Sequence, residues 1–292
     1  MSTDTPQDKW TEWLLNRRFG GNAEHMQLTM DELYPIRDKV LQNANLGENE
    51  TLLDVGCGDG LIAFGAFERS NTVKVVFSDI SQDVLKHDQN IAQEADLIDR
   101  SRFIPASADD LSAITDESVD IVTTRSVLIY VENKKRAFSE FHRVLKPKGR
   151  LSIFEPINRF QHPEPENIYS GYDVTPVIDI AKKIKAVYER LQNPATDPVI
   201  NFDERDLLRF AEQAGFRELH LELNVEIKPH DFDNWDMLLR VAPNPRVPNL
   251  EEAMQEVLTT AEQHAFVEYL RPLVEAKRGM SRWAVAYLWA IK

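Results

Sequence analysis

Hydrophobic residues in this chain fall into two kinds of pattern, and the two alternate along the sequence. Short, continuous apolar runs predict buried strands, and they occur at residues 52–55, 73–77, 102–105, 119–123 and 151–155. Between these runs the apolar residues recur every three or four positions, as at residues 134–145, which is typical of amphipathic helices. This alternation of strand and helix predicts a parallel sheet that is covered by helices on both faces.

The second half of the chain adds two more strands. Residues 203–215 have helical spacing and end in glycine, and residues 219–227 alternate strictly between apolar and polar side chains. Strict alternation predicts a strand that is exposed on one face, near the edge of the sheet. A last strand is expected at residues 283–291. The pattern therefore predicts an α/β fold with a mostly parallel, seven-stranded sheet.

Segments outside the strand and helix pattern of the sheet divide the chain further. The predicted parts, in order, are an N-terminal helical cap (1–46, with a helix over 10–44), the core (47–156), a helical lid insertion (157–200), the core continuation (201–228), a second helical insertion (229–281) and the final core strand (282–292). In the second insertion, Thr260 and Gln263 have the spacing of a helix capping box. Both insertions are candidates for a substrate lid.

Charge narrows the class of partner. The chain has 48 Asp and Glu residues against 34 Lys and Arg, a net charge of -14. Such a surface repels phosphate backbones and anionic lipids, so nucleic acid and membrane are not expected partners. Cys57 is the single cysteine, and the polar N-terminal residues show no apolar signal-peptide stretch. We therefore expect a cytoplasmic protein.

A glycine-rich turn follows the first predicted strand. The sequence LLDVGCGDG at residues 52–60 runs from the strand into a loop with Gly56, Gly58 and Gly60, and a helix follows. Glycines at the carboxyl end of the first strand allow backbone to approach a ligand closely, and a side chain at Gly56 or Gly58 would occupy the ligand's space. A tight turn without a ligand is the alternative.

The spacing of this loop also indicates the kind of ligand. Dinucleotide loops usually read GxGxxG, which would need a glycine at Leu61. The loop also places Asp54 and Asp59 beside the ligand, which favours a cationic group over a pyrophosphate. Asp79, at the end of the second predicted strand, is positioned to bind both hydroxyls of a ribose, although it could instead serve the start of the helix that Ser81 caps.

These motifs resemble the class I S-adenosylmethionine-dependent methyltransferases, in particular the small-molecule branch that includes the ubiquinone/menaquinone C-methyltransferases. The resemblance rests on LLDVGCGDG at 52–60, SDIS at 78–81, residues 106–111 and RVLKPKGRL at 143–151. It covers residues 51–156 strongly and the last two strands less strongly. It implies a Rossmann-like core, S-adenosylmethionine as cofactor, a small-molecule methyl acceptor and no metal.

The resemblance also implies roles for particular residues. Gly56 and Gly58 would back the methionine portion of the cofactor together with Cys57 and Gly60 of the same loop, and Asp54 would hold its amine. Asp79 would bind the ribose and Ile80 would pack on the adenine. The family usually has Gly-Asp-Ala where this chain has Ala106, Ser107 and Ala108, so the adenine contact would pass to Ser107, to a backbone amide or to Asp109. Arg125 and Ser126 would border the methionine portion, with Arg125 on the cofactor carboxylate or in a surface ion pair.

Methyl transfer from a sulfonium requires alignment and exclusion of water more than it requires a base. If a base is used, the candidates by position are Tyr130, Glu155, His162 and His230, for which ordinary packing or surface roles are the alternative. Aromatic residues could line an acceptor pocket or could equally belong to the core: Tyr169, Tyr172, Trp10, Trp13 and Trp235. Two other functions remain open, an NAD-dependent oxidoreductase and a non-catalytic S-adenosylmethionine-binding module.

Overall fold

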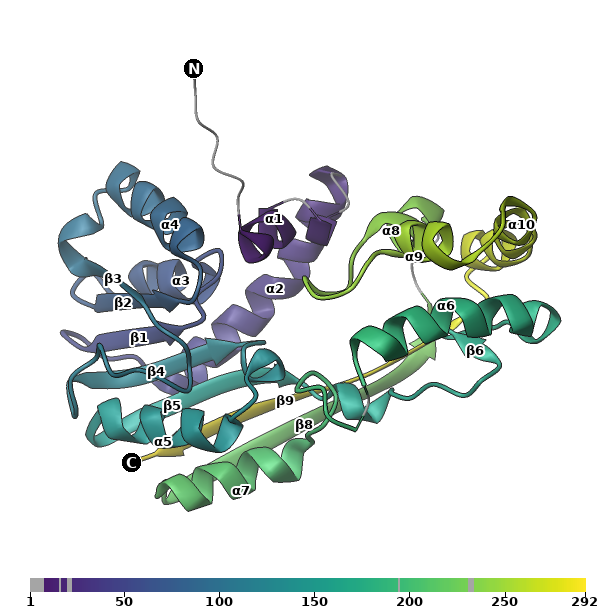
Figure 1. The fold of residues 1–292 in the computed structure, drawn as a ribbon. Helices are drawn as coiled ribbons and strands as arrows, with labels where there is room; N and C mark the ends of the chain where they lie inside the picture. The colour runs from purple at the N-terminus through teal and green to yellow at the C-terminus, as the bar shows by residue number, and fades with distance from the viewer. Residues whose placement is uncertain (1–7, 16, 20–22, 194, 231–233) are drawn as a thin grey trace.

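A seven-stranded mixed sheet organises the molecule (Figure 1), seen in a computed structural model that describes residues 8–15, 17–19, 23–193, 195–230 and 234–292. Its strands are β1 (Thr51–Val55), β2 (Lys74–Asp79), β3 (Ser101–Pro105), β4 (Val119–Arg125), β5 (Leu145–Pro156), β8 (Glu218–Pro229) and β9 (Met280–Ile291). They lie in the order β3-β2-β1-β4-β5-β9-β8, with β1 to β5 parallel and β9 antiparallel to both its neighbours. The predicted Rossmann-like sheet and the edge position of the alternating strand are confirmed.

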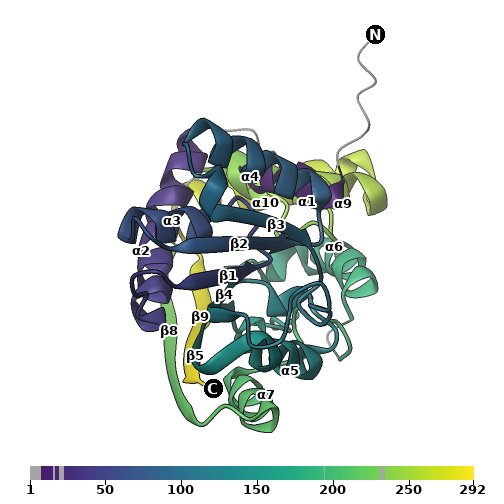
Figure 2. The ribbon, with the colours of Figure 1, turned by 90° about the vertical axis from the view of Figure 1, so that its left-hand side faces the viewer.

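Helices cover both faces of this sheet, as Figure 2 shows with α2 and α3 on one side of the strands and α5 on the other. The helices of the core are α2 (Ala23–Ala44), α3 (Leu61–Arg69), α4 (Gln82–Glu94), α5 (Lys134–Val144) and α7 (Glu204–Ala214), with the short η2 (Ile98–Arg100) and η3 (Leu128–Tyr130). Because adjacent strand residues face opposite ways, Leu52 packs in the cluster under α2 and α3, while Leu53 packs in the cluster under α5 and α7. Each strand thus contributes to two hydrophobic layers.

The two insertions pack against each other and share one hydrophobic cluster. Their elements are η4 (Asn158–Phe160), β6 (Ile168–Tyr169), β7 (Tyr172–Asp173), η5 (Thr175–Val177), α6 (Ile178–Leu191), α8 (Trp235–Arg240), α9 (Leu250–Val257) and α10 (Thr260–Glu275). Ala181 and Ile184 of α6 are fully buried beside Ala253 of α9 and Phe266 of α10. In Figure 1 these helices lie together at one end of β8 and β9. The division into cap, core and insertions stays a prediction, because this packing does not test whether any part folds alone.

Two local predictions were wrong. A single helix over residues 10–44 is replaced by α1 (Lys9–Leu15), η1 (Arg17–Phe19) and α2. The sequence carries two successive glycines at 20 and 21, which are weak helix formers. The capping box lies one residue earlier than predicted: Glu262 N donates to Thr259 Oγ1 at 3.3 Å and Thr259 N donates to Glu262 Oε2 at 2.9 Å. This register places a carboxylate, rather than an amide, at the positive end of α10.

No helix within the described residues combines the length and the apolar character that a bilayer span requires.

Candidate functional site

The glycine loop, residues 56–60, leaves the carboxyl end of β1 with three left-handed glycines. Gly56, Gly58 and Gly60 have φ of 64°, 56° and 71°. A Cβ on Gly56 would lie 2.4 Å from Cγ2 of Val127, so packing against protein, and not a ligand, explains this glycine. At Gly58 the nearest atom to such a Cβ is Leu14 Cδ1 at 3.8 Å, an ordinary contact. The space beside Gly58 is therefore not filled by closely packed protein atoms.

Asp54 lies at the base of this loop with its carboxyl group buried. Its Oδ1 accepts a hydrogen bond from Thr123 Oγ1 on β4 at 2.9 Å. Its Oδ2 has no hydrogen-bond partner among the described residues, and the backbone N–H of Ala63 is close enough to the carboxyl group to lower its pKa. Burial raises the pKa of Asp54 to about 7, against the lowering effect of Thr123 and of Arg125. A buried acid with an unmatched oxygen is suited to a cationic or amine partner.

Asp79 joins the loop to the helix that follows β2. Its Oδ2 accepts from Gly58 N at 3.1 Å and its Oδ1 accepts from Ser81 N at 2.9 Å. Burial raises the pKa of Asp79, and these two N–H groups act in the opposite direction. Ser81 Oγ accepts from Val84 N at 3.1 Å, so the predicted cap of α4 is confirmed. The carboxyl group of Asp79 thus holds the glycine loop against the start of α4, and its binding of a ribose stays a prediction.

Asp88 is a member of this site that the sequence reasoning missed. It lies on the inner face of α4 and is fully buried, and Cys57 Sγ donates to its Oδ2 at 3.4 Å. Burial raises the pKa of Asp88 to about 8, and the nearby charge of Asp59 adds to this shift. Burial likewise raises the pKa of the Cys57 thiol. The signal was present in the sequence, because Asp88 falls at helical spacing on the apolar stripe that includes Val84 and Leu85.

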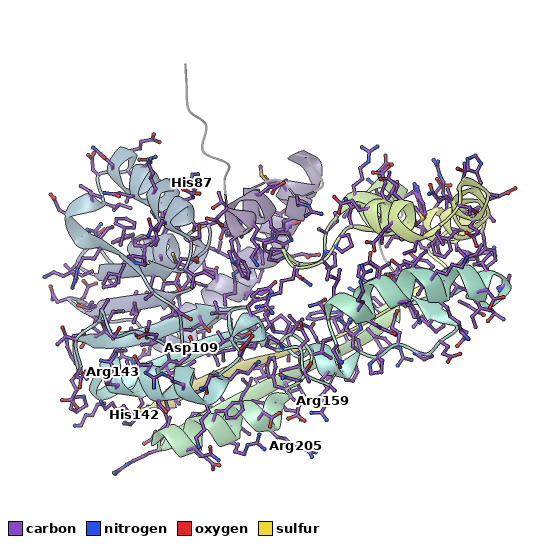
Figure 3. All side chains as sticks on the ribbon, in the orientation of Figure 1. His87, Asp109, His142, Arg143, Arg159 and Arg205 are labelled. Carbon is purple, nitrogen blue, oxygen red and sulfur yellow. The ribbon has the colours of Figure 1, made fainter. Side chains whose placement is uncertain are left out.

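The residues predicted for the adenine side lie beyond β2 and β3. Ile80 directly follows Asp79 and is 53% exposed, which is unusual for an isoleucine at the edge of a core. Ser107 Oγ donates to Asp109 Oδ1 at 2.5 Å, and Ala108 between them is buried. Arg136 Nε donates to the carbonyl of Asp109 at 2.8 Å, which ties this loop to the first turn of α5. Figure 3 labels Asp109 near that end of α5.

Glu155 anchors the turn after β4 and does not face open space. Its Oε1 accepts from the amides of Val127 and Leu128 at 3.0 and 2.9 Å, and its Oε2 accepts from Ile129 N at 3.3 Å. The residue is fully buried at the end of β5, and this burial raises its pKa to about 7. Ser126 starts the same turn with φ of 57°. These contacts give Glu155 a structural role in placing residues 126–130.

Tyr130 ends η3 in a group of aromatic and basic side chains. The ring of Trp10, from α1, packs edge-on against it at 4.9 Å. Burial raises the pKa of Tyr130 to about 12, although Arg246, Arg18 and Arg125 are near enough to oppose the shift. A phenol with that pKa is protonated at neutral pH, so Tyr130 can donate a hydrogen bond but is a poor general base.

The N-terminal cap connects this region to the core and to an insertion. Thr11 Oγ1 lies 3.1 Å from Ser81 Oγ at the start of α4, and Trp13 Nε1 donates to the carbonyl of Ala242 at 2.9 Å. Arg18 Nη1 lies 3.4 Å from Asp59 Oδ2, and Arg125 Nη2 lies 3.8 Å from Asp59 Oδ1. The cap therefore spans the glycine loop between α4 and the second insertion.

Other candidates lie elsewhere. His230 stacks on Tyr172 at 4.9 Å, and its Nε2 lies 3.0 Å from the carbonyl of Ser170. His162 is influenced by Glu164 and Lys185, and burial lowers its pKa. Both histidines are thus surrounded by residues of the insertions and not by the glycine loop. The same holds for Tyr169, Tyr172 and Trp235, which belong to the buried cluster of the insertions. Within the described residues no group of three or more acidic, His or Cys side chains is arranged for a metal ion.

Comparison with known proteins identifies what this chain is similar to. The family described as "Methyltransferase domain" matches residues 46–215, more than half of the chain. The ubiquinone/menaquinone biosynthesis C-methyltransferase UbiE of Rickettsia typhi is 29% identical over 224 residues, which span 72% of this chain and 87% of that protein. The Rickettsia prowazekii protein of the same name is 28% identical over the same length.

Solved structures share the fold. A Bacillus halodurans protein described as a methyltransferase has a TM-score of 0.54 and 24% identity, covering 88% of this chain and 98% of that one. The phosphoethanolamine N-methyltransferase 2 of Haemonchus contortus, solved with S-adenosyl-L-methionine, has a TM-score of 0.52 and 13% identity, covering 97% of this chain and 56% of that one.

Proposed function

Because this chain belongs to the class I S-adenosylmethionine-dependent methyltransferases, with S-adenosylmethionine as the methyl donor, we propose that it methylates a small molecule at the carboxyl edge of its parallel sheet. The proposed location rests on one observation, which is that three suitable features meet at one edge of the sheet. The glycine loop, the unmatched carboxyl oxygen of Asp54 and the exposed Ile80 lie at consecutive strand ends of that edge. Ligands of open α/β sheets bind at this edge.

The residues present fit the cofactor. Gly58 offers close approach to backbone, because a Cβ there would meet only Leu14 at 3.8 Å and 3.9 Å. Asp54 would hold the amine of the methionine portion, Asp79 would take the ribose hydroxyls, and Ile80 would cover the adenine. Ser107 or Asp109 would meet the adenine edge in place of the aspartate that the family usually carries. Cys57 and Gly60 shape the loop from inside, and Ser126 borders it.

Methyl transfer requires mainly that the protein position the donor and the acceptor. When bound, S-adenosylmethionine supplies an electrophilic methyl group on a sulfonium. The chain's own residues align the acceptor with it and exclude water, since displacement in line is sensitive to orientation. Trp10 and Tyr130 form an apolar wall, and Tyr130 offers a proton donor. Glu155 acts by holding the turn that carries Tyr130.

Two features of the chain and the names of its relatives support a small-molecule acceptor. The net charge of -14 disfavours nucleic acid. The N-terminal cap reaches from Ser81 to Ala242 across the glycine loop, which suits an acceptor that can be enclosed. The UbiE proteins that the chain resembles are C-methyltransferases of ubiquinone and menaquinone biosynthesis by name, and such acceptors are small molecules.

The test is calorimetric titration of the full chain with S-adenosylhomocysteine and, separately, with NAD. We expect S-adenosylhomocysteine to bind and NAD not to bind. The Asp79→Ala variant should lose affinity by about tenfold or more, as expected for lost charge-assisted hydrogen bonds. The Glu94→Gln variant, on the exposed side of α4, should bind normally. Binding of NAD alone would overturn the proposal.

Turnover separates an enzyme from a binding module. The protein is incubated with S-adenosylmethionine labelled in its methyl group and a library of phenols, quinols, amines and acids of low mass. Transfer of label to at least one compound is the expected result. Transfer only to nucleic acid or protein would contradict the proposed acceptor class.

A further inference from the structure

The sheet ends in a long strand, β8, whose outer edge carries exposed apolar side chains. β8 is last in the sheet order, and within the described residues it pairs with β9 alone. Leu223, Val225 and Ile227 are 40%, 47% and 50% exposed, although large aliphatic side chains are usually buried. We propose that residues 222–228, the β8 edge, pair with the same edge of a second copy of this chain in a two-fold symmetric dimer. This dimer is independent of the proposed function.

The apolar residues of the β8 edge are exposed because α7 is too short to cover them. The 11 residues of α7 span about 17 Å, whereas the 12 residues of β8 span about 40 Å. Leu219 and Leu221, at the start of β8, pack against the core cluster to which Leu207 and Ala211 of α7 belong. In Figure 1, α7 runs beside only part of β8. The three exposed residues lie further along the same face, beyond this cover.

The backbone of the β8 edge has hydrogen-bonding groups that the sheet does not use. Val225 lies opposite Ala284 of β9, but the carbonyl of Ala284 accepts from Ile157 N at 2.8 Å, on the β5 side of β9. Opposed residues of an antiparallel pair are alternately bonded and not bonded to each other, so the even-numbered residues of β8 bond to β9. The N–H and C=O groups of Leu223, Val225 and Ile227 therefore point away from β9. Such groups form a template for pairing with another strand.

The sequence of the β8 edge suits pairing with itself. If the two-fold axis passes through Val225, each Val225 faces its counterpart and Leu223 faces Ile227 of the second copy, so apolar side chains meet on one face. On the other face, Glu222 then lies opposite Lys228 of the second copy, a pair of opposite charge. Shifting the axis by one residue in either direction would set glutamates opposite each other. This self-complementarity points to a second copy of the chain, and not to a different protein.

The charged side chains beside the β8 edge keep their present contacts in this pairing. Glu222 is paired with Lys39 of α2, Lys228 Nζ lies 3.1 Å from Glu226 Oε2, and Glu226 Oε2 accepts from Trp283 Nε1 at 2.9 Å. Backbone hydrogen bonds and the burial of apolar side chains drive the association, and the charges select the register. The two copies can therefore meet without releasing any of these side chains from its partner.

Sedimentation velocity of the full chain over a range of concentrations tests the dimer. We expect a reversible species of twice the 33.6 kDa of the chain, with a dissociation constant of about 100 μM or lower. Hydrogen exchange at low and high concentration should show that the amides of Leu223, Val225 and Ile227 become protected in the dimer. A monomer at about 100 μM, or a dimer without this protection, would overturn the inference, because the β8 edge would then have another occupant or none.

Opposite charges at the axis test the register. Val225→Lys would set two ammonium groups against each other and Val225→Glu two carboxylates, so each variant should weaken the dimer at least about tenfold. An equimolar mixture of the two variants should recover association, because an ammonium group then faces a carboxylate. Unchanged dimerisation in either variant alone, or no recovery in the mixture, would overturn the inference.

A matched control separates the effect of position from the effect of added charge. Leu191, the last residue of α6, is an aliphatic side chain that is 44% exposed and lies outside the β8 edge. Leu191→Lys should dimerise as the unchanged protein does. Equal weakening of the dimer in Leu191→Lys and Val225→Lys would overturn the inference, since charge alone would then explain the loss. Circular dichroism of each variant should match that of the unchanged protein, because residue 225 is at the surface.

Discussion

Replacing Asp88 by asparagine should make the protein more stable at neutral and alkaline pH. In the folded chain Asp88 is fully buried, and burial raises its pKa from 3.8 to about 8. Asparagine has the shape of the protonated acid, and its carbonyl oxygen can still accept from the Cys57 thiol. The variant therefore retains the packing but cannot acquire the unfavourable buried charge.

The magnitude follows from linkage. A carboxyl group whose pKa is higher in the folded state contributes its full stability below its unfolded pKa, and this contribution is lost as pH rises towards the folded pKa. For Asp88 that window runs from 3.8 to about 8. One proton changes the free energy of unfolding by about 1.4 kcal/mol per pH unit. The advantage of Asp88→Asn over the unchanged protein should therefore grow by about 3 kcal/mol across two pH units inside the window.

The measurement is urea unfolding of both proteins at several pH values between about 5 and 7. Glu94→Gln removes an exposed carboxylate from the same helix and should run parallel to the unchanged protein. Asp54, whose pKa is also raised, to about 7, makes all three proteins lose stability as pH rises, so the difference between curves is the quantity that matters. If Asp88→Asn and the unchanged protein differ by the same amount at every pH, the reasoning is refuted.

Three further changes test the packing of the site. Gly56→Ala places a methyl group 2.4 Å from Val127 Cγ2 at a residue in the left-handed conformation, so thermal unfolding should show that the free energy of unfolding falls by about 1–3 kcal/mol. A second substitution in the same chain, Val127→Ala, should restore part of this loss, and no recovery would contradict the clash. Glu155→Gln places an amide NH2 group against backbone N–H groups, so urea unfolding should show that the free energy of unfolding falls by about 1–3 kcal/mol. The control is the exposed Glu132→Gln, and an equal loss in both variants would contradict the structural role of Glu155. Thr123→Val removes the hydrogen-bond donor to Asp54 Oδ1 and so raises the pKa of Asp54 further. The free energy of unfolding should fall by about 1–3 kcal/mol, and by more above pH 7 than below it, whereas Thr123→Ser, which keeps the hydroxyl group, should unfold as the unchanged protein does.

The core of the fold could be predicted because its elements are periodic. Leu52 and Leu53 sit in a short apolar run that has to be buried on both faces, and such runs occur mainly in parallel sheets. The interruption between α1 and α2 was missed because apolar residues recur at helical spacing on both sides of it. The capping box was displaced by one residue because both Thr259 and Thr260 precede a residue that can close the motif.

Some residues of the candidate site could likewise be found from the sequence and others could not. The glycine loop and Asp79 could be found because they are adjacent to predicted strand ends. Arg18 and Arg246, which lie near Tyr130, could not, since they are far apart in the sequence and only the packing of the cap on the insertion brings both near that ring. His162 and His230 were candidates by their position in the chain, but a position within an insertion does not determine which side chains surround it.

The second insertion leaves the sheet at Pro229 of β8 and returns at Met280 of β9, and these two residues are partners in the antiparallel ladder. Its ends are therefore fixed next to each other by the hairpin, whatever the chain does between them. Because closing a loop becomes only slowly more costly as the loop lengthens, such an excursion tolerates large changes in size. Because its helices share one hydrophobic cluster with α6, we expect its length to vary only together with the first insertion, while the order and register of the seven strands stay the same.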